Sequence, residues 1–229
     1  MFRLPRTRKA RIQVVTVLAF LTAFYFGARY AAYWLERDAI HIELMQAIQK
    51  DDTAALEQLL RDGATPNSAN PAAFSVQADL PLHAVARTDN TEGLRLLLDH
   101  GAKVDVTNAN GWTPLHFAAA GGRLSTARSL VEAGASLHVT ANAPRDGTPA
   151  AQALQRGLLV MARYLLFEAG KGDLRDEPVD LLLEYAAGLQ DPELVGRLLD
   201  ADANPDSKAH VDLPLYLAVK SGATETAQL

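Results

Sequence analysis

The stretch GWTPLHFAAAGG, from Gly111 to Gly122, decides the fold that this sequence predicts. Thr113 is a preferred helix N-cap residue, and Pro114 suits the first helical position. The alanines that follow predict a short helix able to pack closely on a neighbour, and Gly122 suits its end. His116 in this stretch could be a catalytic base, a metal ligand or a scaffold residue. The choice among these depends on whether the pattern recurs.

The pattern does recur, at a spacing of about 33 residues. Its successive starts are Ile42, Leu80, Thr113, Thr148, Leu181 and Leu213. A second landmark follows the first five starts at a constant distance: Leu59-Leu60, Leu97-Leu98, Leu130-Val131, Leu165-Leu166 and Leu198-Leu199. Behind these pairs stand residues that suit a helix end: Gly63, Gly101, Gly134, Gly170 and Asp202. Two landmarks in register predict two helices and a turn in each unit.

These features resemble the ankyrin repeat, a unit of two antiparallel helices and a turn with a T-P-L-H signature. The resemblance covers residues 40–229 and is strongest in the units that start at 80 and 113. It implies an all-α solenoid of about six helix–turn–helix units, starting near 42, 80, 113, 148, 181 and 213. The last unit is incomplete, because the leucine pair of its second helix would fall beyond Leu229.

The resemblance also implies that the signature histidine is part of the scaffold, hydrogen-bonded to threonine and nearby backbone so that adjacent units are tied together. His116 matches this position fully, whereas His83 matches it with Leu80 in place of threonine. Later units carry Ala151, Glu184 and Tyr216 there, so we expect them to be less regular, the 148 unit most of all. The structural residues predicted in this way are Thr113, Pro114, His116, His83, Gly101 and Gly134.

The N-terminal segment differs from the repeats. Residues 1–11 carry five basic residues and no acid, and Ile12–Ala28 carry no charge. At about 1.5 Å per residue this run is slightly shorter than a hydrocarbon core of about 30 Å, but flanking apolar and aromatic residues extend it. We interpret 12–35 as a single-pass transmembrane signal-anchor helix in the lipid bilayer. The basic tail, 1–11, is then cytoplasmic, and the repeats are extracytoplasmic, on the periplasmic side of the inner membrane in a bacterium.

Two other interpretations of this segment remain open. A cleaved signal peptide has the same charged start and apolar middle, although no clean A-x-A site follows the run. A mitochondrial targeting segment is also rich in arginine and poor in acids. Cleavage would make the protein a soluble exported ankyrin binding protein.

Composition argues against several functional classes. The net charge of −5 gives no electrostatic reason to expect nucleic acid as a partner. Without cysteine the chain has no disulfide and no thiolate metal site, and its six histidines are scattered. No nucleophile elbow or phosphate-binding loop occurs, and the acidic run DLRDEPVD at 173–180 is interpreted as a solvated loop. We therefore expect no enzyme, no cofactor and no metal.

The expected function is binding of a protein partner of unknown identity through the concave surface of the solenoid. The ankyrin resemblance places the residue before each start, and the residues after the first-helix alanines, in that groove. The partner-binding residues predicted in this way are Trp112, Arg87, Arg156, Lys50, Lys220, Asp79 and Asp180. Trp112 beside the small Ala120 and Gly121 would form an apolar centre with charged contacts on either side.

Three alternatives to a partner-binding groove in a membrane-anchored chain remain open. Trp112 could fold back beside Val106 or His138. The charged side chains could merely keep the groove soluble. The repeats could also be the ankyrin part of a larger protein with a catalytic or channel domain.

Overall fold

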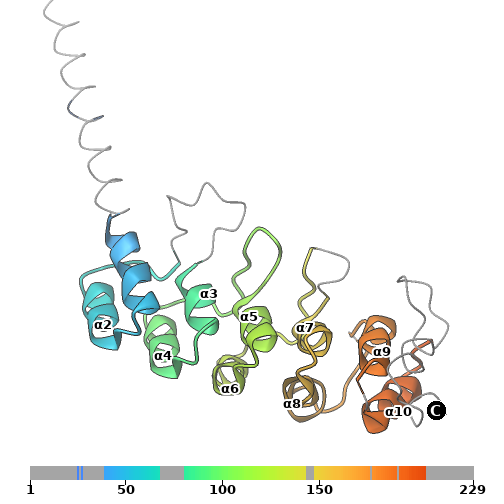
Figure 1. Cartoon of the computed structure of the whole chain (residues 1–229). Helices are drawn as coiled ribbons and strands as arrows, with labels where there is room; N and C mark the ends of the chain where they lie inside the picture. The colour runs from blue at the N-terminus through green and yellow to red at the C-terminus, as the bar shows by residue number, and fades with distance from the viewer. Residues whose placement is uncertain are drawn as a thin grey trace, which may run out of the picture.

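The computed structural model describes residues 25, 27, 39–67, 80–142, 147–175, 177–189 and 191–204. Within these ranges every regular element is a helix, and no strand is present. The helices come in pairs, and successive pairs are stacked one after another along the molecule (Figure 1). This is the all-helical solenoid that the repeat pattern predicts.

The helices are short and closely spaced along the chain. A helical stretch at 39–49 precedes α2 (Thr53–Arg61), α3 (Pro81–Ala86), α4 (Thr91–Asp99), α5 (Pro114–Gly121), α6 (Leu124–Glu132), α7 (Pro149–Gln155), α8 (Leu159–Arg163), η1 (Tyr164–Ala169), α9 (Val179–Ala187) and α10 (Pro192–Asp200).

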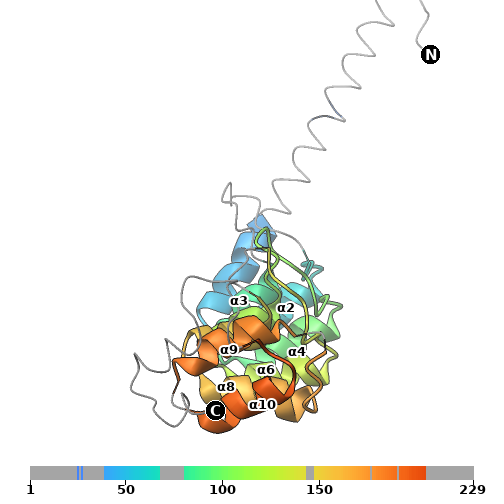
Figure 2. The same cartoon turned by 90° about the vertical axis from the view of Figure 1, so that its right-hand side faces the viewer.

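The helices form two rows. The first helices of successive units, α3, α5, α7 and α9, lie side by side, and α5 contacts both α3 and α7. The second helices form the other row, in which α4 contacts α2 and α6. Figure 2, which looks at the molecule from the α9–α10 end, shows the pairs one behind another. Each unit therefore packs mainly on its sequence neighbours, as solenoid units do.

Local sequence explains how the best-matched unit begins and ends its helices. Thr113 is the N-cap of α5 with extended backbone angles, and Pro114 is the first helical residue. Gly122 ends α5 in the left-handed conformation at φ 66°. Gly101 and Gly134 follow α4 and α6 at φ 86° and 89°, values that favour glycine because it lacks a Cβ.

One continuous core runs between the two rows. Alanines such as Ala118 and Ala119 in α5 are fully buried and let neighbouring first helices approach closely. Leucines such as Leu97 in α4 and Leu130 in α6 fill the space between the rows and are also fully buried. Burying each leucine stabilises the fold by about 1.5–3 kcal/mol. The regular spacing of the leucine pairs along the sequence therefore favours the regular stacking of the units.

The unit that starts at Thr148 departs from the regular pattern in its second helix. α8 continues directly into η1, a π-helical segment. The backbone N–H of Gly170 donates to the carbonyl of Leu165, five residues earlier, at 3.0 Å. A π-helix accommodates an additional residue, which explains why Gly170 comes one place late relative to the other units. The left-handed position after this helix is at Lys171, with φ 55°.

The unit expected to start at Leu181 begins earlier than the repeat spacing predicts. Its first helix, α9, starts at Val179 with Pro178 as the N-cap. Proline lacks a backbone N–H and has a fixed φ, so it suits the start of a helix. Leu181 is buried inside the helix and does not precede it. Asp180 therefore lies in the first helical turn, and the prediction that it precedes the start of its unit is wrong.

None of the helices in the described ranges is both long enough and apolar enough to cross a membrane. Apart from Tyr25 and Gly27, the segment 12–35 lies outside those ranges, as does the tail 1–11. Asp79, Lys220 and the unit predicted from Leu213 also lie outside them.

Candidate functional site

The signature histidine is enclosed by the scaffold. His116 is fully buried, and its Nδ1 accepts a hydrogen bond from the backbone N–H of Thr113 at 3.1 Å. The Thr113 hydroxyl lies 2.9 Å from the same nitrogen. Nε2 is 3.2 Å from the carbonyl oxygen of Gly147, and a carbonyl can only accept, so Nε2 carries the proton. His116 thus joins α5 to the segment before α7, and it is not placed to act as a solvent-facing base.

His83 repeats this arrangement in the preceding unit. Its Nδ1 accepts from the backbone N–H of Leu80 at 3.0 Å, and its Nε2 donates to the carbonyl of Val106 at 2.9 Å. The hydrogen bond from the backbone N–H of residue 80 to His83 is still formed, because it does not depend on the side chain at position 80. Replacing threonine by Leu80 removes only the hydroxyl contact.

A carboxylate occupies the equivalent place in the 148 unit, where Ala151 replaces histidine. The Thr148 hydroxyl donates to the Glu177 carboxylate at 2.7 Å. The other carboxylate oxygen of Glu177 lies 2.9 Å from Nδ1 of His138. Glu177 is only 9% exposed, so the expectation that residues 173–180 form a simple solvated loop is wrong at this residue.

Trp112 packs onto the first turn of its own helix. Its ring stacks on His116, with centroids 5.9 Å apart and planes inclined by 30°, and lies 5.0 Å from the ring of Phe117. The Trp112 side chain is half-buried. The ring is therefore held against its own helix and is not fully exposed.

An asparagine-rich turn holds Trp112 in this position. The Asn108 side-chain oxygen accepts from the backbone N–H groups of Asn110 and Trp112, both at 3.0 Å. The backbone N–H of Asn142 in the next unit donates to the Asn110 carbonyl at 2.9 Å. Gly111 adopts φ 77°, and a Cβ there would lie 2.9 Å from the Asn142 nitrogen, so only glycine fits.

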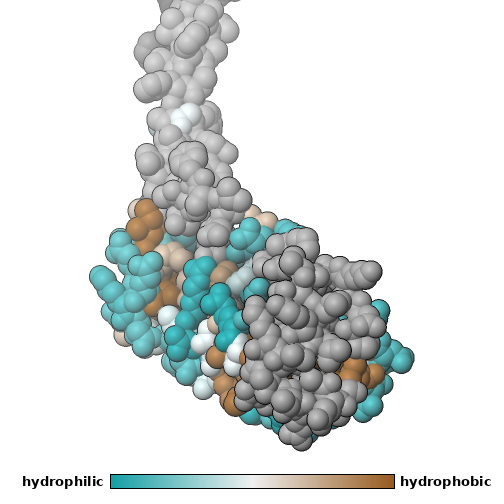
Figure 3. Space-filling view, turned by 45° about the vertical axis from the view of Figure 1, so that its right-hand side comes forward, coloured by the Kyte–Doolittle hydropathy of each residue, from teal (hydrophilic) through white to brown (hydrophobic). Residues whose placement is uncertain are grey.

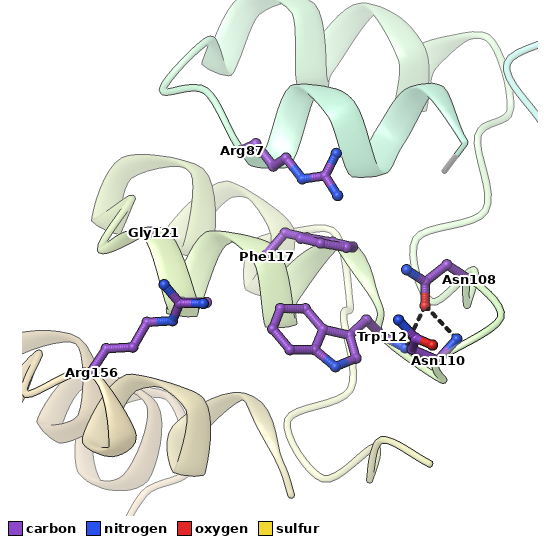
Figure 4. Close-up of a pocket in the computed structure, with 8 residues that line it drawn as sticks. Arg87, Asn108, Asn110, Trp112, Phe117, Gly121 and Arg156 are labelled. Atoms are coloured by element: carbon purple, nitrogen blue, oxygen red, sulfur yellow. Dashed lines mark hydrogen bonds between the residues drawn. The ribbon is translucent and has the colours of Figure 1, made fainter. Parts of the chain in front are cut away.

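These residues form one side of a pocket of about 350 Å³. We call it the central pocket, and it is lined by Arg87, Asn108, Asn110, Trp112, Phe117, Ala120, Gly121 and Arg156. Figure 4 shows Arg87 over Phe117, while Arg156 extends from α7 toward the same pair of rings. The guanidinium carbon of Arg87 lies 4.3 Å from the Phe117 ring centroid, a cation–π contact.

The structure brings together one subset of the residues predicted to bind a partner. Trp112, Arg87 and Arg156 share the central pocket with Ala120 and Gly121. Sequence reasoning missed Phe117, Asn108 and Asn110. The position of Phe117, three residues before Ala120 in α5, places it on the same helical face and could have identified it.

Other predicted binding residues lie elsewhere. Lys50 is exposed at the end of the helical stretch 39–49 and does not line the central pocket. Asp180 is half-buried in α9 and accepts a hydrogen bond from the backbone N–H of Asn204 at 2.7 Å. Within the described ranges, no three histidine or acidic side chains are grouped as a metal site would require.

Comparison with known proteins identifies the repeats. A family model described as ankyrin repeats, in three copies, matches residues 44–143. An ankyrin repeat protein of Rickettsia bellii is 30% identical over 114 residues, which are 41% of this chain and 48% of that protein. Human ankyrin repeat and SOCS box protein 16 is 31% identical over 159 residues, 65% of this chain and 34% of that protein.

The human Notch-regulated ankyrin repeat-containing protein is 34% identical over 77 residues, 34% of this chain and 67% of that protein. The chain spans about half the length of the Rickettsia relative and about a third of the SOCS box relative. With the signature histidines and paired helices described above, these matches show that the chain belongs to the ankyrin repeat family.

Proposed function

We propose that this protein binds a protein partner through the face of the solenoid that contains the central pocket. Ankyrin repeats are in general protein–protein interaction modules. The observation that carries the proposal is that three successive units contribute to one pocket. Arg87 ends the first helix of one unit, Trp112 and Phe117 belong to the next, and Arg156 ends the first helix of the third.

The composition of the pocket suits a binding hot spot. Tryptophan and arginine are enriched among residues that dominate binding energies, because each combines a large contact surface with polar donors. A volume of about 350 Å³ is near the lower end for small-molecule sites and matches one or two partner side chains. We infer that the pocket anchors a partner that continues along the groove.

The rest of the surface favours partner binding centred on the central pocket over binding through a broad apolar interface. Among the residues that Figure 3 colours by hydropathy, hydrophilic ones predominate and the apolar areas are small and separate. The large hydrophobic residues exposed in the described part are Tyr25, Ile42 and Val160, and none of them lines the central pocket. We propose no catalytic activity for this chain, and His116 serves the scaffold.

Site-directed photo-crosslinking tests the proposed face. A photoreactive residue at position 120, inside the pocket, should crosslink the partner in intact cells. A photoreactive residue in place of the exposed Glu132 on α6, in the other helix row, is the matched control. If position 132 captures the partner and position 120 does not, the partner binds another face.

We also propose that residues 12–35 anchor the repeats to a membrane. The uncharged run Ile12–Ala28 and the basic tail 1–11 support this part of the proposal. An anchored protein should stay with membranes after alkaline carbonate extraction, whereas a chain lacking 1–38 should become soluble. Release of a shortened parent chain into the soluble fraction would instead favour the exported, cleaved form. The length of the complete reading frame tests whether the repeats belong to a larger protein.

A further inference from the structure

We propose that the central pocket recognises an acidic peptide segment of the protein partner. An aspartate or glutamate carboxylate would lie between Arg87 and Arg156, and a neighbouring apolar side chain would pack on Trp112 and Phe117. This inference rests on the proposed function and narrows it to one class of partner.

The first argument is the charge of the pocket. Among the described residues that line it, two are arginines and none is acidic, although the whole chain has a net charge of −5. A third arginine, Arg123, lies alongside, because its Nε donates to the carbonyl of Arg87 at 3.3 Å. The nearby Asp89 accepts a hydrogen bond from the Thr126 hydroxyl in α6 at 3.2 Å. The pocket is therefore a locally positive site on a negative protein.

The second argument is the contrast between Arg156 and Arg163, an arginine of the same unit. Arg163 is held by the carboxylates of Asp191 and Glu193, at 2.9 and 2.7 Å. Arg156 is exposed and forms no ion pair within the ranges that the structure describes. Its guanidinium is therefore available to a carboxylate from outside the chain, which it can bind through two parallel hydrogen bonds.

The third argument is the shape of the pocket between the arginines. Arg87 is the C-cap of α3 and Arg156 the C-cap of α7, whereas the same region of α5 carries the small Ala120 and Gly121. The two arginines thus come from the units on either side of α5, and the small Ala120 and Gly121 line the pocket with them. Figure 4 shows Phe117 next to Arg87, and Arg156 reaching the pocket from α7. A short acidic side chain suits this space better than a long basic one, which would face two like charges.

The aromatic pair explains why the ligand is a peptide segment and not a single anion. The Arg87 guanidinium lies over the Phe117 ring, with its carbon 4.3 Å from the ring centroid, so its positive charge is held at the aromatic side of the pocket. Trp112 and Phe117 provide a half-buried apolar wall that a free anion would leave uncovered. An apolar residue next to the acidic one would cover this wall.

Selection of ligands from a displayed library of short random peptides tests the proposal. The full chain is the target, and the synthetic copy of the most enriched peptide is then the probe. We expect an aspartate or glutamate beside an apolar residue in the enriched peptides. Replacing that acid by its amide should weaken binding about tenfold, the loss expected for a hydrogen bond to a charged group.

Three variants locate the bound peptide. Ala120→Glu supplies an internal carboxylate between the two arginines, and Arg156→Glu reverses one charge, so each should weaken peptide binding about tenfold or more. Lys103→Glu makes the same charge change at an exposed residue that does not line the pocket, and it should bind like the parent. Circular dichroism melting curves check that each variant is folded.

The outcomes separate this inference from the proposed function. A fourth variant, Ala120→Leu, fills the pocket without adding charge. If it abolishes binding but the amide peptide binds as well as the acidic one, the pocket is a binding site and acidic recognition is refuted. If neither Ala120→Leu nor Ala120→Glu affects any enriched peptide, the proposed binding face and the acidic ligand are both refuted.

Discussion

His116 shows how one side chain connects two units of the solenoid. Its ring nitrogens bridge the backbone of Thr113 and the carbonyl of Gly147, which lie in different units. The alternatives that the sequence left open, a base or a metal ligand, both need a nitrogen that faces solvent or a ligand. Both ring nitrogens are already occupied by buried scaffold groups, so the ring contributes to stability.

His116→Ala should lower the free energy of unfolding by about 1–3 kcal/mol, because it leaves the buried N–H of Thr113 without its acceptor. It also removes one of the two hydrogen bonds to the Gly147 carbonyl, which still accepts from the N–H of Ala141. Urea unfolding followed by circular dichroism measures the change. His100→Ala is the matched control, since His100 is exposed and its Nδ1 contacts only the Leu96 carbonyl of its own helix. Unchanged stability of His116→Ala with lost ligand binding would overturn the scaffold role.

Trp112→Ala should weaken peptide binding by about 2 kcal/mol, as expected for an aromatic hot spot. The contacts of Trp112 with His116 and Phe117 predict a modest fall in melting temperature as well. Fluorescence anisotropy of the labelled peptide and a thermal melt measure the two effects. Parent-like affinity in this variant would exclude Trp112 from the binding site.

At the scale of the helix, Asp191 connects the irregular 148 unit to the next one. Its side chain caps α10 by accepting from the backbone N–H of Leu194 at 3.1 Å. The same carboxylate accepts from Nε and Nη2 of Arg163, at 3.0 and 2.9 Å. Burial raises the pKa of Asp191, but the hydrogen bonds from Arg163 and the helix backbone outweigh it and hold that pKa below its usual range.

Asp191→Ala should cost about 1–2 kcal/mol through the lost cap, with a further loss from the broken ion pair. Asp191→Asn is the matched control, because asparagine still caps the helix but carries no charge. Since the folded-state pKa of Asp191 is lowered, its contribution is complete at neutral pH and is lost as pH falls below about 4. Urea unfolding at neutral and acidic pH should therefore show a weaker acid destabilisation in Asp191→Asn than in the parent. An identical pH dependence would contradict this role.

At the scale of the whole molecule, the proposed membrane anchor predicts an orientation. The basic residues of 1–11 should remain in the cytoplasm, which places the repeats on the other side of the membrane. A reporter that is active only outside the cytoplasm, fused after Asn70, should therefore be active. The same reporter behind a chain lacking 1–38 is the control and should be inactive. Resistance of the repeats to protease in intact spheroplasts, lost on lysis, would refute the orientation.

The repeat architecture was predictable because its signals are local. Thr113 and Pro114 start α5, and Gly101 and Gly134 follow the ends of α4 and α6, through backbone preferences that act within a few residues. Repetition of these signals with the leucine pairs predicted an ankyrin solenoid, and the family comparison confirmed it. The convergence of Trp112, Arg87 and Arg156 followed from applying the same repeat geometry to three adjacent units.

Only the tertiary structure decided features that depend on contacts between units. Glu177 takes the place of the missing histidine because the fold brings it to Thr148, 29 residues earlier in the chain. Trp112 turns onto Phe117 because the turn that holds it is bonded to Asn142 of the next unit. The amino-acid pattern of one repeat specifies its own helices and their ends. The direction of a side chain at the junction depends on which groups the neighbouring unit presents, and that is settled only when the units stack.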